Sequence, residues 1–429
     1  MKLEKLKLTN FRGFREFEIT FDPSFTVLLG GNMAGKTAVL DGAAFALRLM
    51  LTPSKVPEIT DGDVHRIIAE INGAADLQAQ FPVIIEAEAR IDDQLSPGGH
   101  PIFRICREGP DAGTRLERVN GHLYPLAHGS GLGMQVPLPV VAQYGTQRHW
   151  LRSNPAADVR GVGSRFDGYT GCFDIQSTHG TLAGWMRKQT LVQLQRGGGY
   201  IQPQLAAVEA AIKCCIDDTT RFWFDIQYDE LRLERPGGDI QSFAMLSEGY
   251  RNMVALVADI AWRTAVLNPQ HGAQANLLTE GVVLIDELDL HLHPAWQQRV
   301  VGDLRRTFPK IQFIVTTHSP QIVASVSRSQ IRLLDHNQLV AEEPYVEGRN
   351  SDELLEDVFG VPSRPENVQA EIDALYRLIE DEDFATARTR LAALQERLGP
   401  DDTAMIKARW LLDTEDPQQN SEPPPPPPP

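Results

Sequence analysis

Residues 30–37, GGNMAGKT, place glycines, a lysine and a threonine in the spacing G-x-x-x-x-G-K-[ST]. Glycines at these points let backbone N–H groups turn towards phosphate oxygens, and a helix after the loop adds the positive end of its dipole. Lys36 then reaches the β- and γ-phosphates of a nucleotide, and Thr37 supplies an oxygen to Mg²⁺. The residues expected to line this site are Gly30, Gly31, Asn32, Ala34, Gly35, Lys36, Thr37 and Ala38.

Two apolar segments further along the chain end in polar residues that suit the same chemistry. The first, GVVLIDE at 281–287, delivers Asp286 to bind Mg²⁺ and Glu287 to polarise the attacking water. The second, IVTTHSP at 314–320, ends at His318, which is expected to contact the γ-phosphate and sense its loss. Together with the phosphate-binding loop at 30–37, these residues predict hydrolysis of a nucleoside triphosphate.

A further helix start, LSEGYRNM at 246–253, forms a second cradle for an anion. One phosphate chain cannot easily be wrapped by two cradles of one subunit. A composite site resolves this: Ser247 and Gly249 of one subunit close on the γ-phosphate held by another. Two subunits then enclose two nucleotides with twofold symmetry. Glu248 and Arg251 are assigned to the same contact, where Arg251 alternatively holds the helix start against the partner.

The pair His291 and His293 in ELDLHLHP has the alternate spacing of two metal ligands on an extended stretch. No third or fourth ligand lies nearby in the sequence. The favoured interpretation is therefore a loop that packs at a nucleotide-dependent interface.

Strands and helices must bring these residues together, and the hydrophobic pattern predicts them. SFTVLLG is typical of a buried strand that runs into the phosphate-binding loop, and AVLDGAAFALRLML is typical of the helix after it. Later strands alternate with helices, which predicts an α/β fold with a largely parallel sheet. Alternating segments at 3–22 and 83–107 add an antiparallel β lobe, whose first hairpin turns at Arg12 and Gly13.

The chain is expected to form one large domain with insertions. Residues 365–412 are interpreted as a helical hairpin with a turn near Gly399 and Pro400, and no long-period repeat is evident. Seven prolines at 423–429 predict a polyproline II or disordered tail with no catalytic role. The expected parts are an N-lobe at 1–150, a partly helical insertion at 151–240, a C-lobe at 241–350, an acidic helical appendage at 351–415 and a proline-rich tail at 416–429.

The chain of 429 residues is 42% hydrophobic and 23% charged, as in a protein with a large core. Its apolar runs are too short to span a bilayer, its N-terminus shows no apolar signal region, and its four cysteines have no framework spacing. We therefore expect a cytoplasmic protein with reduced thiols. The net charge of −16 disfavours indiscriminate nucleic-acid binding, although it is compatible with a local basic groove.

The motifs GGNMAGKT, LSEGYR, LIDELDLHLHP and TTHSP, in this order, resemble an ABC-type ATPase of the RecF/SMC/OLD group, and LTNFRGF resembles the first hairpin of that group. The resemblance covers most of residues 1–330. It implies ATP and Mg²⁺ as ligands, dimerisation on ATP, Asp289 in the D-loop and Arg12 near the nucleotide. It also implies a glutamine at a strand end beside the Mg²⁺, for which Gln143 is the candidate and Gln147 the competitor.

Segment lengths favour one branch of this group. Only about a hundred residues separate Gln143 from Leu246, without the sustained heptads of SMC-type coiled coils. The segment after His318 lacks the acidic metal cluster of the OLD-family nucleases. The C-terminal portion resembles stand-alone defence ATPases of the Septu type, the PtuA proteins, which are paired with a separate HNH endonuclease.

The resemblance therefore implies an ATPase that dimerises by enclosing ATP and regulates a partner nuclease in anti-phage defence. Residues 365–412 would dock that partner or another copy, or would simply pack onto the core. The alternative function is a RecF-like ATPase of DNA repair that binds DNA through a basic face. Its candidate residues are Arg148, Arg152, Arg160 and Arg165, with Trp150 and Phe166 interleaved.

Overall fold

The computed structural model describes residues 1–52, 55–71, 74–92, 95–96, 98, 100–120, 136–146, 164–174 and 179–415. The chain divides into two compact units, Met1–Leu354 and Leu355–Pro429. Within the described ranges, no helix is long and apolar enough to cross a bilayer. The predicted proline-rich tail at 416–429 lies outside the described residues.

A six-stranded sheet forms the centre of the first unit, in the order β16-β15-β3-β14-β13-β9. Its five longer strands are parallel, and β16 pairs antiparallel with β15 at one edge. Every residue of β3, β9, β13 and β14 is buried, which explains why these segments are continuous apolar runs. The predicted α/β fold is confirmed. The strands are β3 (Phe25–Leu29), β9 (Val140–Tyr144), β13 (Gly281–Ile285), β14 (Ile311–Thr316), β15 (Ile331–Asp335) and β16 (Gln338–Leu339).

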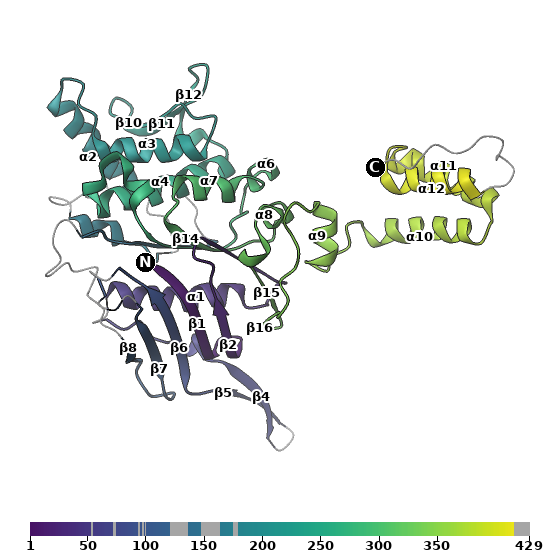
Figure 1. Ribbon diagram of the computed structural model, residues 1–429, viewed down its shortest axis with the longest axis horizontal. Coiled ribbons are helices and arrows are strands. Elements are labelled where there is room, and N and C mark those ends of the chain that lie inside the picture. Colours follow the sequence, from purple (N-terminus) through teal and green to yellow (C-terminus); the bar gives the residue numbers. More distant parts are fainter. Residues whose placement is uncertain are drawn as a thin grey trace. The chain divides into compact units, whose positions relative to one another are not determined.

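An antiparallel sheet in the order β2-β1-β6-β7-β8 forms the predicted β lobe. Helix α1 (Lys36–Leu51) contacts β1 and β6 on one side and β13 and β14 on the other, so it lies between the two sheets (Figure 1). This position explains why α1 is apolar around most of its circumference. The lobe comprises β1 (Lys2–Phe11), β2 (Phe14–Thr20), β6 (Val83–Arg90), β7 (Ile102–Arg107) and β8 (Arg115–Asn120), and a separate hairpin of β4 (Arg66–Ile71) and β5 (Ala74–Ala79) extends from it in Figure 1.

Helices α3 and α4 lie on the opposite side of the parallel sheet from α1 (Figure 1). The insertion predicted to be partly helical contains α2 and α3, and a three-stranded sheet that was not predicted follows α3 after Cys215. Phe222 and Phe224 are buried while Trp223 between them is half-buried, and this period of two indicates a strand. The elements are α2 (His179–Arg196), α3 (Pro203–Cys215), β10 (Arg221–Asp225), β11 (Glu230–Glu234), β12 (Ile240–Ser242), α4 (Glu248–Leu267), α5 (Ala275–Leu278), α6 (Pro294–Gln297), α7 (Val300–Thr307), α8 (Pro320–Ala324) and α9 (Ser351–Asp357).

Short 3₁₀ turns connect several of these elements. They are η1 (Asp61–Asp63), η2 (Arg165–Tyr169), η3 (Phe243–Met245), η4 (Pro269–Gln274) and η5 (Arg328–Gln330). Two of them matter for the site, since η1 supplies an acidic residue to the first hairpin and η3 leads directly into α4.

The second unit contains three helices rather than the predicted hairpin: α10 (Glu366–Glu380), α11 (Phe384–Leu398) and α12 (Thr403–Glu415). Sequence reading missed the first turn because its acidic residues resemble an exposed helix face. Asp383 instead caps α11 by accepting a hydrogen bond from the Thr386 N–H at 3.2 Å. The buried residues of α10 and α12 belong to one core, and in each helix they lie on a single face. The two sets are Ile372, Leu375 and Ile379, and Met405, Ala408 and Leu412.

Candidate nucleotide-binding site

The phosphate-binding loop joins β3 to α1, and its glycines are required by close packing. Gly35 has φ 95°, and a Cβ there would lie 2.5 Å from the Phe14 ring. A Cβ on Gly30 would lie 2.3 Å from the Leu334 carbonyl oxygen. Larger residues would therefore displace the loop from the start of α1. Nothing lies within 4 Å of the corresponding position on Gly31, which leaves the loop open beside it.

Lys36 folds back against this loop. Its Nζ donates hydrogen bonds to the carbonyl oxygens of Gly30 at 2.8 Å and Gly31 at 2.9 Å. Burial lowers the pKa of Lys36 from its ordinary value, although the nearby carboxylates of Asp286, Glu287 and Asp289 raise it. An incoming phosphate would favour the charged form of Lys36, as expected for a residue placed to bind triphosphate.

Asp286 meets Thr37 at the carboxyl end of β13. The Thr37 hydroxyl donates to one carboxylate oxygen of Asp286 at 3.1 Å, and the Thr316 hydroxyl donates to the other at 2.6 Å. Thr316 also accepts the Glu287 N–H at 2.7 Å, so β14 fixes both acidic residues. One hydroxyl and one carboxylate suit Mg²⁺, which keeps several waters and takes further ligands from substrate phosphates. Within the described residues, no group of three or more His, Cys, Asp or Glu side chains is placed to hold a metal ion without such help.

Glu287 itself has a left-handed backbone with φ 51°. A residue with a side chain rarely takes this left-handed conformation. Backbone strain of this kind is typical of positions held for function. Its N–H is bound to Thr316, and the next residue, Leu288, donates its N–H to the Thr316 carbonyl oxygen at 2.9 Å. The turn after β13 is therefore held against β14.

Asp289 links this turn to the predicted sensor loop. Its carboxylate accepts the Thr317 hydroxyl at 2.6 Å and the His318 N–H at 3.2 Å. His318 thus follows directly after β14, at the same sheet edge as Asp286. The structure places Asp286, Glu287, Asp289 and His318 on two adjacent strand ends, as their positions in the sequence suggested.

Asp41 connects the two residues that were assigned by resemblance. It is ion-paired with Arg12, and it accepts a hydrogen bond from the Gln143 side chain at 3.0 Å. Arg12 also pairs with Asp63 at 3.1 Å. Asp41 was missed by the sequence analysis, although its position one helical turn after Thr37 puts both on one face of α1. Gln147, the competing residue for the role of Gln143, lies outside the described residues.

Ser247 occupies the N-cap position of α4 without a capping hydrogen bond from its side chain, and the residues after it pack against the D-loop of the same chain. A Cβ on Gly249 would lie only 2.1 Å from the His291 carbonyl oxygen, so glycine is required here even without a second subunit. Glu248 lies 3.6 Å from the His291 ring, and Arg251 donates to the Ala244 carbonyl oxygen at 3.4 Å. The helix start is thus shaped in part by its own chain, a constraint that the sequence did not reveal.

The two histidines of the H-x-H pair have separate surroundings. His291 faces Glu248, whereas the Nδ1 atom of His293 accepts the Ala295 N–H at 3.3 Å and caps α6. This agrees with a packing loop rather than a metal site.

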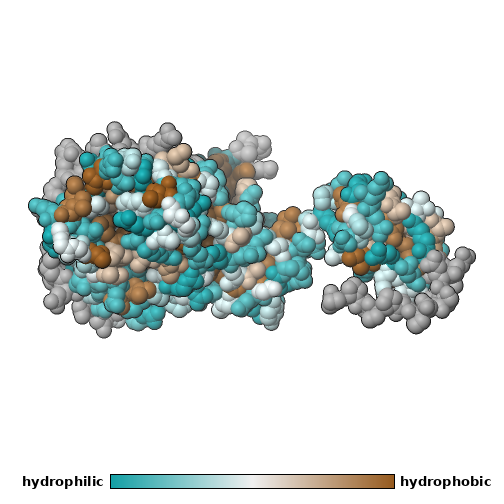
Figure 2. Space-filling view, turned by 90° about the horizontal axis from the view of Figure 1, so that it is seen from above, coloured by the Kyte–Doolittle hydropathy of each residue, from teal (hydrophilic) through white to brown (hydrophobic). Residues whose placement is uncertain are grey.

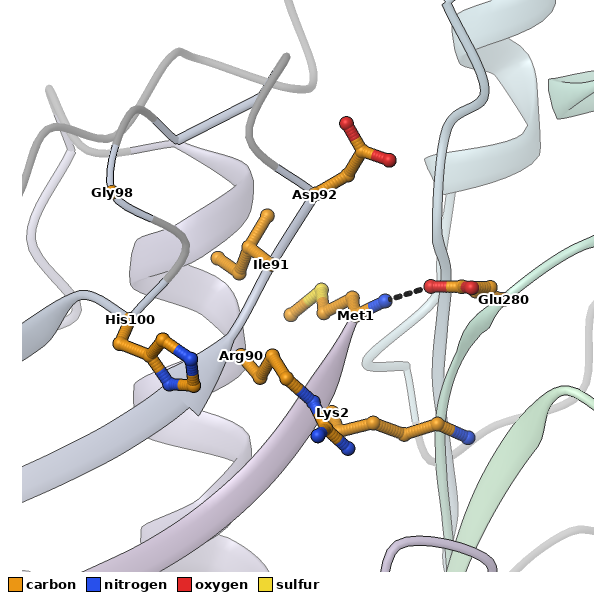
Figure 3. A pocket seen from close by; sticks show the side chains of 8 residues that line it. All are labelled: Met1, Lys2, Arg90, Ile91, Asp92, Gly98, His100 and Glu280. Atoms are coloured by element: carbon orange, nitrogen blue, oxygen red, sulfur yellow. Dashed lines mark hydrogen bonds and ion pairs between the residues drawn. The ribbon is translucent and has the colours of Figure 1, made fainter.

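A cavity of about 580 Å³ lies elsewhere, beside the start of β1 (Figure 3). The Met1 ammonium group donates to the Glu280 carboxylate at 2.6 Å, and Figure 3 shows this bond with Lys2, Arg90 and His100 nearby. Glu280 precedes β13, so this cavity is at the amino end of the strand whose carboxyl end carries Asp286. The cavity is therefore separate from the phosphate-binding loop.

Two family models match the segments that build the site. One, described as "AAA ATPase domain", matches residues 1–95, and another, described as "AAA domain, putative AbiEii toxin, Type IV TA system", matches residues 216–324. The "Septu protein PtuA" of Bacillus mycoides (strain KBAB4) is 33% identical over 142 residues, which cover 32% of this chain and 19% of that protein. The chain carries an ABC-type ATPase domain close to those of the PtuA proteins.

Other relatives extend this comparison. The "Retron Ec83 probable ATPase" of Escherichia coli is 41% identical over 173 residues, covering 39% of this chain and 31% of that protein. This chain therefore spans less than a third of that relative's length. Among solved structures, the SMC head domain from Thermotoga maritima is 14% identical with a TM-score of 0.44, and the match covers 79% of this chain and 98% of that one.

Proposed function

We propose that this ABC-type ATPase binds ATP with Mg²⁺ and dimerises by enclosing two ATP molecules. The hydrogen bond between Thr37 and Asp286 carries the proposal, because it brings the ends of the phosphate-binding loop and of β13 to one point. In this proposal Lys36 binds the β- and γ-phosphates, and Thr37 and Asp286 hold Mg²⁺, which neutralises charge on the phosphates. Glu287 orients and deprotonates the attacking water, and His318 contacts the γ-phosphate.

The second subunit supplies Ser247 and Gly249 to the γ-phosphate, with Glu248, Arg251 and Asp289 beside the contact. The exposed start of α4 supports this assignment, since the N-terminus of a long helix attracts phosphate. The close packing of Gly249 on His291 couples this helix start to the D-loop. Closure of the dimer would therefore move the two segments together.

We further place the ATPase in anti-phage defence, where it regulates a separate HNH-type nuclease. The similarity to Septu and retron proteins supports this role. The alternative, direct DNA binding, is less well supported, because Arg165 donates to the carbonyl oxygens of Leu267 and Val136 at 2.8 Å each instead of facing solvent. Of the other residues of the proposed basic face, Phe166 lies in η2, and Arg148, Trp150, Arg152 and Arg160 lie outside the described residues.

Replacing Glu287 by Gln tests the ATPase mechanism. Removal of the general base should slow hydrolysis by about 10²–10⁴-fold while ATP binding persists, so the closed dimer accumulates. Sedimentation velocity with and without ATP measures the dimer, and phosphate release measures the rate. Lys36→Ala, which should lose nucleotide affinity, is the matched control. A Glu287→Gln protein that binds ATP yet stays monomeric would contradict the composite site.

The defence role has its own test. Co-expression with an HNH-type nuclease of the proposed kind should yield a complex, and nuclease activity in it should depend on ATP. A nuclease that neither binds this chain nor responds to ATP would refute the regulatory role while leaving the ATPase intact.

A further inference from the structure

The methionines of this chain fall into two sharply different groups. All except Met134 are in the described ranges. Five of them, Met1, Met50, Met186, Met253 and Met405, are at most 3% exposed. The other two, Met33 and Met245, are 95% and 83% exposed, more than any other large apolar side chain that the structure describes.

Met33 lies at the tip of the phosphate-binding loop. Its backbone is left-handed, with φ 68°, a conformation that disfavours a side chain and suits glycine. The spacing of the motif requires no particular residue at this position. An apolar side chain here therefore costs backbone strain and exposes apolar surface to water. Because the side chain is almost fully exposed, packing within its own copy does not offset these two costs.

Met245 ends η3, two residues before Ser247. It is followed by the buried Leu246, which anchors the turn into α4. The two exposed methionines thus flank the two halves of the proposed composite site. Other exposed apolar residues lie elsewhere, among them Ile68 and Leu77, which pair across the β4–β5 hairpin, and Figure 2 shows separate brown patches within a mainly hydrophilic surface.

We infer that Met33 of one copy packs beside Met245 of a second copy when ATP closes the dimer. The inference rests on the proposed function, because the composite site brings the loop of one copy to the helix start of the other. Twofold symmetry would form this contact twice. Methionine suits it, since its flexible thioether adapts to an irregular surface and is enriched at interfaces.

Electrostatics supply the reason for such a contact. Each copy has a net charge of −16, so two copies repel one another before ATP adds further negative charge. An apolar contact does not depend on charge, so it stabilises the dimer despite this repulsion. An ion pair at the same place would be weakened by salt. The methionine contact therefore adds to the stability of the closed dimer without contributing to ATP binding within one copy.

The test measures the dimer dissociation constant of Glu287→Gln in saturating ATP. Met33→Gly and Met245→Ser should each weaken the dimer about tenfold or more, as expected for a largely buried methionine. Ile68→Ser is the matched control: Ile68 is 75% exposed on β4 and should have no effect. Dissociation constants of both methionine variants equal to that of the parent would overturn the inference.

ATP affinity must be measured separately, in the Ser247→Arg background, where closure should be blocked. There Met245→Ser, which lies outside the phosphate-binding loop, should change ATP affinity by no more than about twofold. A larger loss would show that Met245 acts within its own copy and would also overturn the inference. If Glu287→Gln itself binds ATP without dimerising, the proposed function fails, which is a distinct outcome.

Discussion

Asp41 contacts two motif residues of the N-lobe at once. It pairs with Arg12 from the first hairpin and accepts the Gln143 amide from β9. Asp41→Asn keeps an acceptor for Gln143 but removes the charge that holds Arg12. We expect Asp41→Asn to lower kcat about tenfold, and Asp41→Ala to lower it further. Steady-state ATPase assays with both variants test this. Equal rates for Asp41→Asn and the parent would show that the ion pair with Arg12 is dispensable.

The lowered pKa of Lys36 makes ATP binding depend on pH. Below this lowered pKa, Lys36 is charged with or without ATP, so affinity should not change with pH. Above it, ATP binding must restore the proton that burial has removed, and affinity should fall as pH rises. Calorimetry at alkaline pH in buffers of different ionisation heat should detect proton uptake. Lys36→Arg, which stays charged throughout this range, should bind ATP without it. Identical uptake by both proteins would assign the proton to another group.

At the scale of single residues, the sequence predicted those that belong to contiguous motifs. Lys36, Thr37, Asp286 and His318 could be named because strand–loop–helix context restricts where they lie. Asp41 and Thr316 could not, because their roles depend on which helix and strand meet them after folding. The packing of Gly249 on His291 is a contact of the same kind, made between segments distant in the chain.

At the scale of elements, a buried ionic network joins α4 to β9. Asp259 and Arg263 form an ion pair at 2.8 Å with almost no exposure. The Tyr144 hydroxyl donates to Asp259 at 2.6 Å, and Arg263 donates to the carbonyl oxygen of Gly168 in η2 at 2.8 Å. The helix that follows Ser247 is therefore attached to the strand that carries Gln143.

In this network each buried charge should be tolerated only while its partner is present. Asp259→Leu or Arg263→Met alone should lower the free energy of unfolding by about 3–5 kcal/mol, because each leaves an unpaired buried charge. The double variant should lose less than the sum of the two, since no charge remains. Urea unfolding of the parent, both single variants and the double variant measures the coupling. Additive losses would show that the two charges act independently.

The elements themselves were predicted where one hydrophobic pattern, either alternation or a continuous apolar run, dominates the segment. The buried strands β3, β13 and β14 are continuous apolar runs, and β1 and β2 bury alternate residues over part of their length. Strand β10 was missed because it follows a helix closely and has only two buried aromatic residues. The third helix of the C-terminal unit was missed because the acidic turn at 381–383 carries neither glycine nor proline.

At the scale of the whole molecule, the C-terminal unit has a core of its own. The apolar residues that were expected to dock a partner or to pack on the ATPase core instead pack on one another, with Leu375, Met405 and Leu412 fully buried. The ATPase unit, Met1–Leu354, likewise has its own core, which includes Leu354. Each unit therefore has a hydrophobic core of its own.

Ending the chain after Asp357, so that α9 is kept, tests this division. We expect the truncated protein to bind ATP with unchanged affinity, because every residue proposed to contact ATP precedes Leu354. Its binding to the nuclease should be lost if the three helices form the docking surface. ATP titration and co-purification with the nuclease measure the two properties on one protein. A core variant, Leu375→Asp, should disrupt the three helices in the full chain and give the same result. Retained nuclease binding in both proteins would place the docking surface on the ATPase unit, whereas loss of ATP binding would show that the two units fold together.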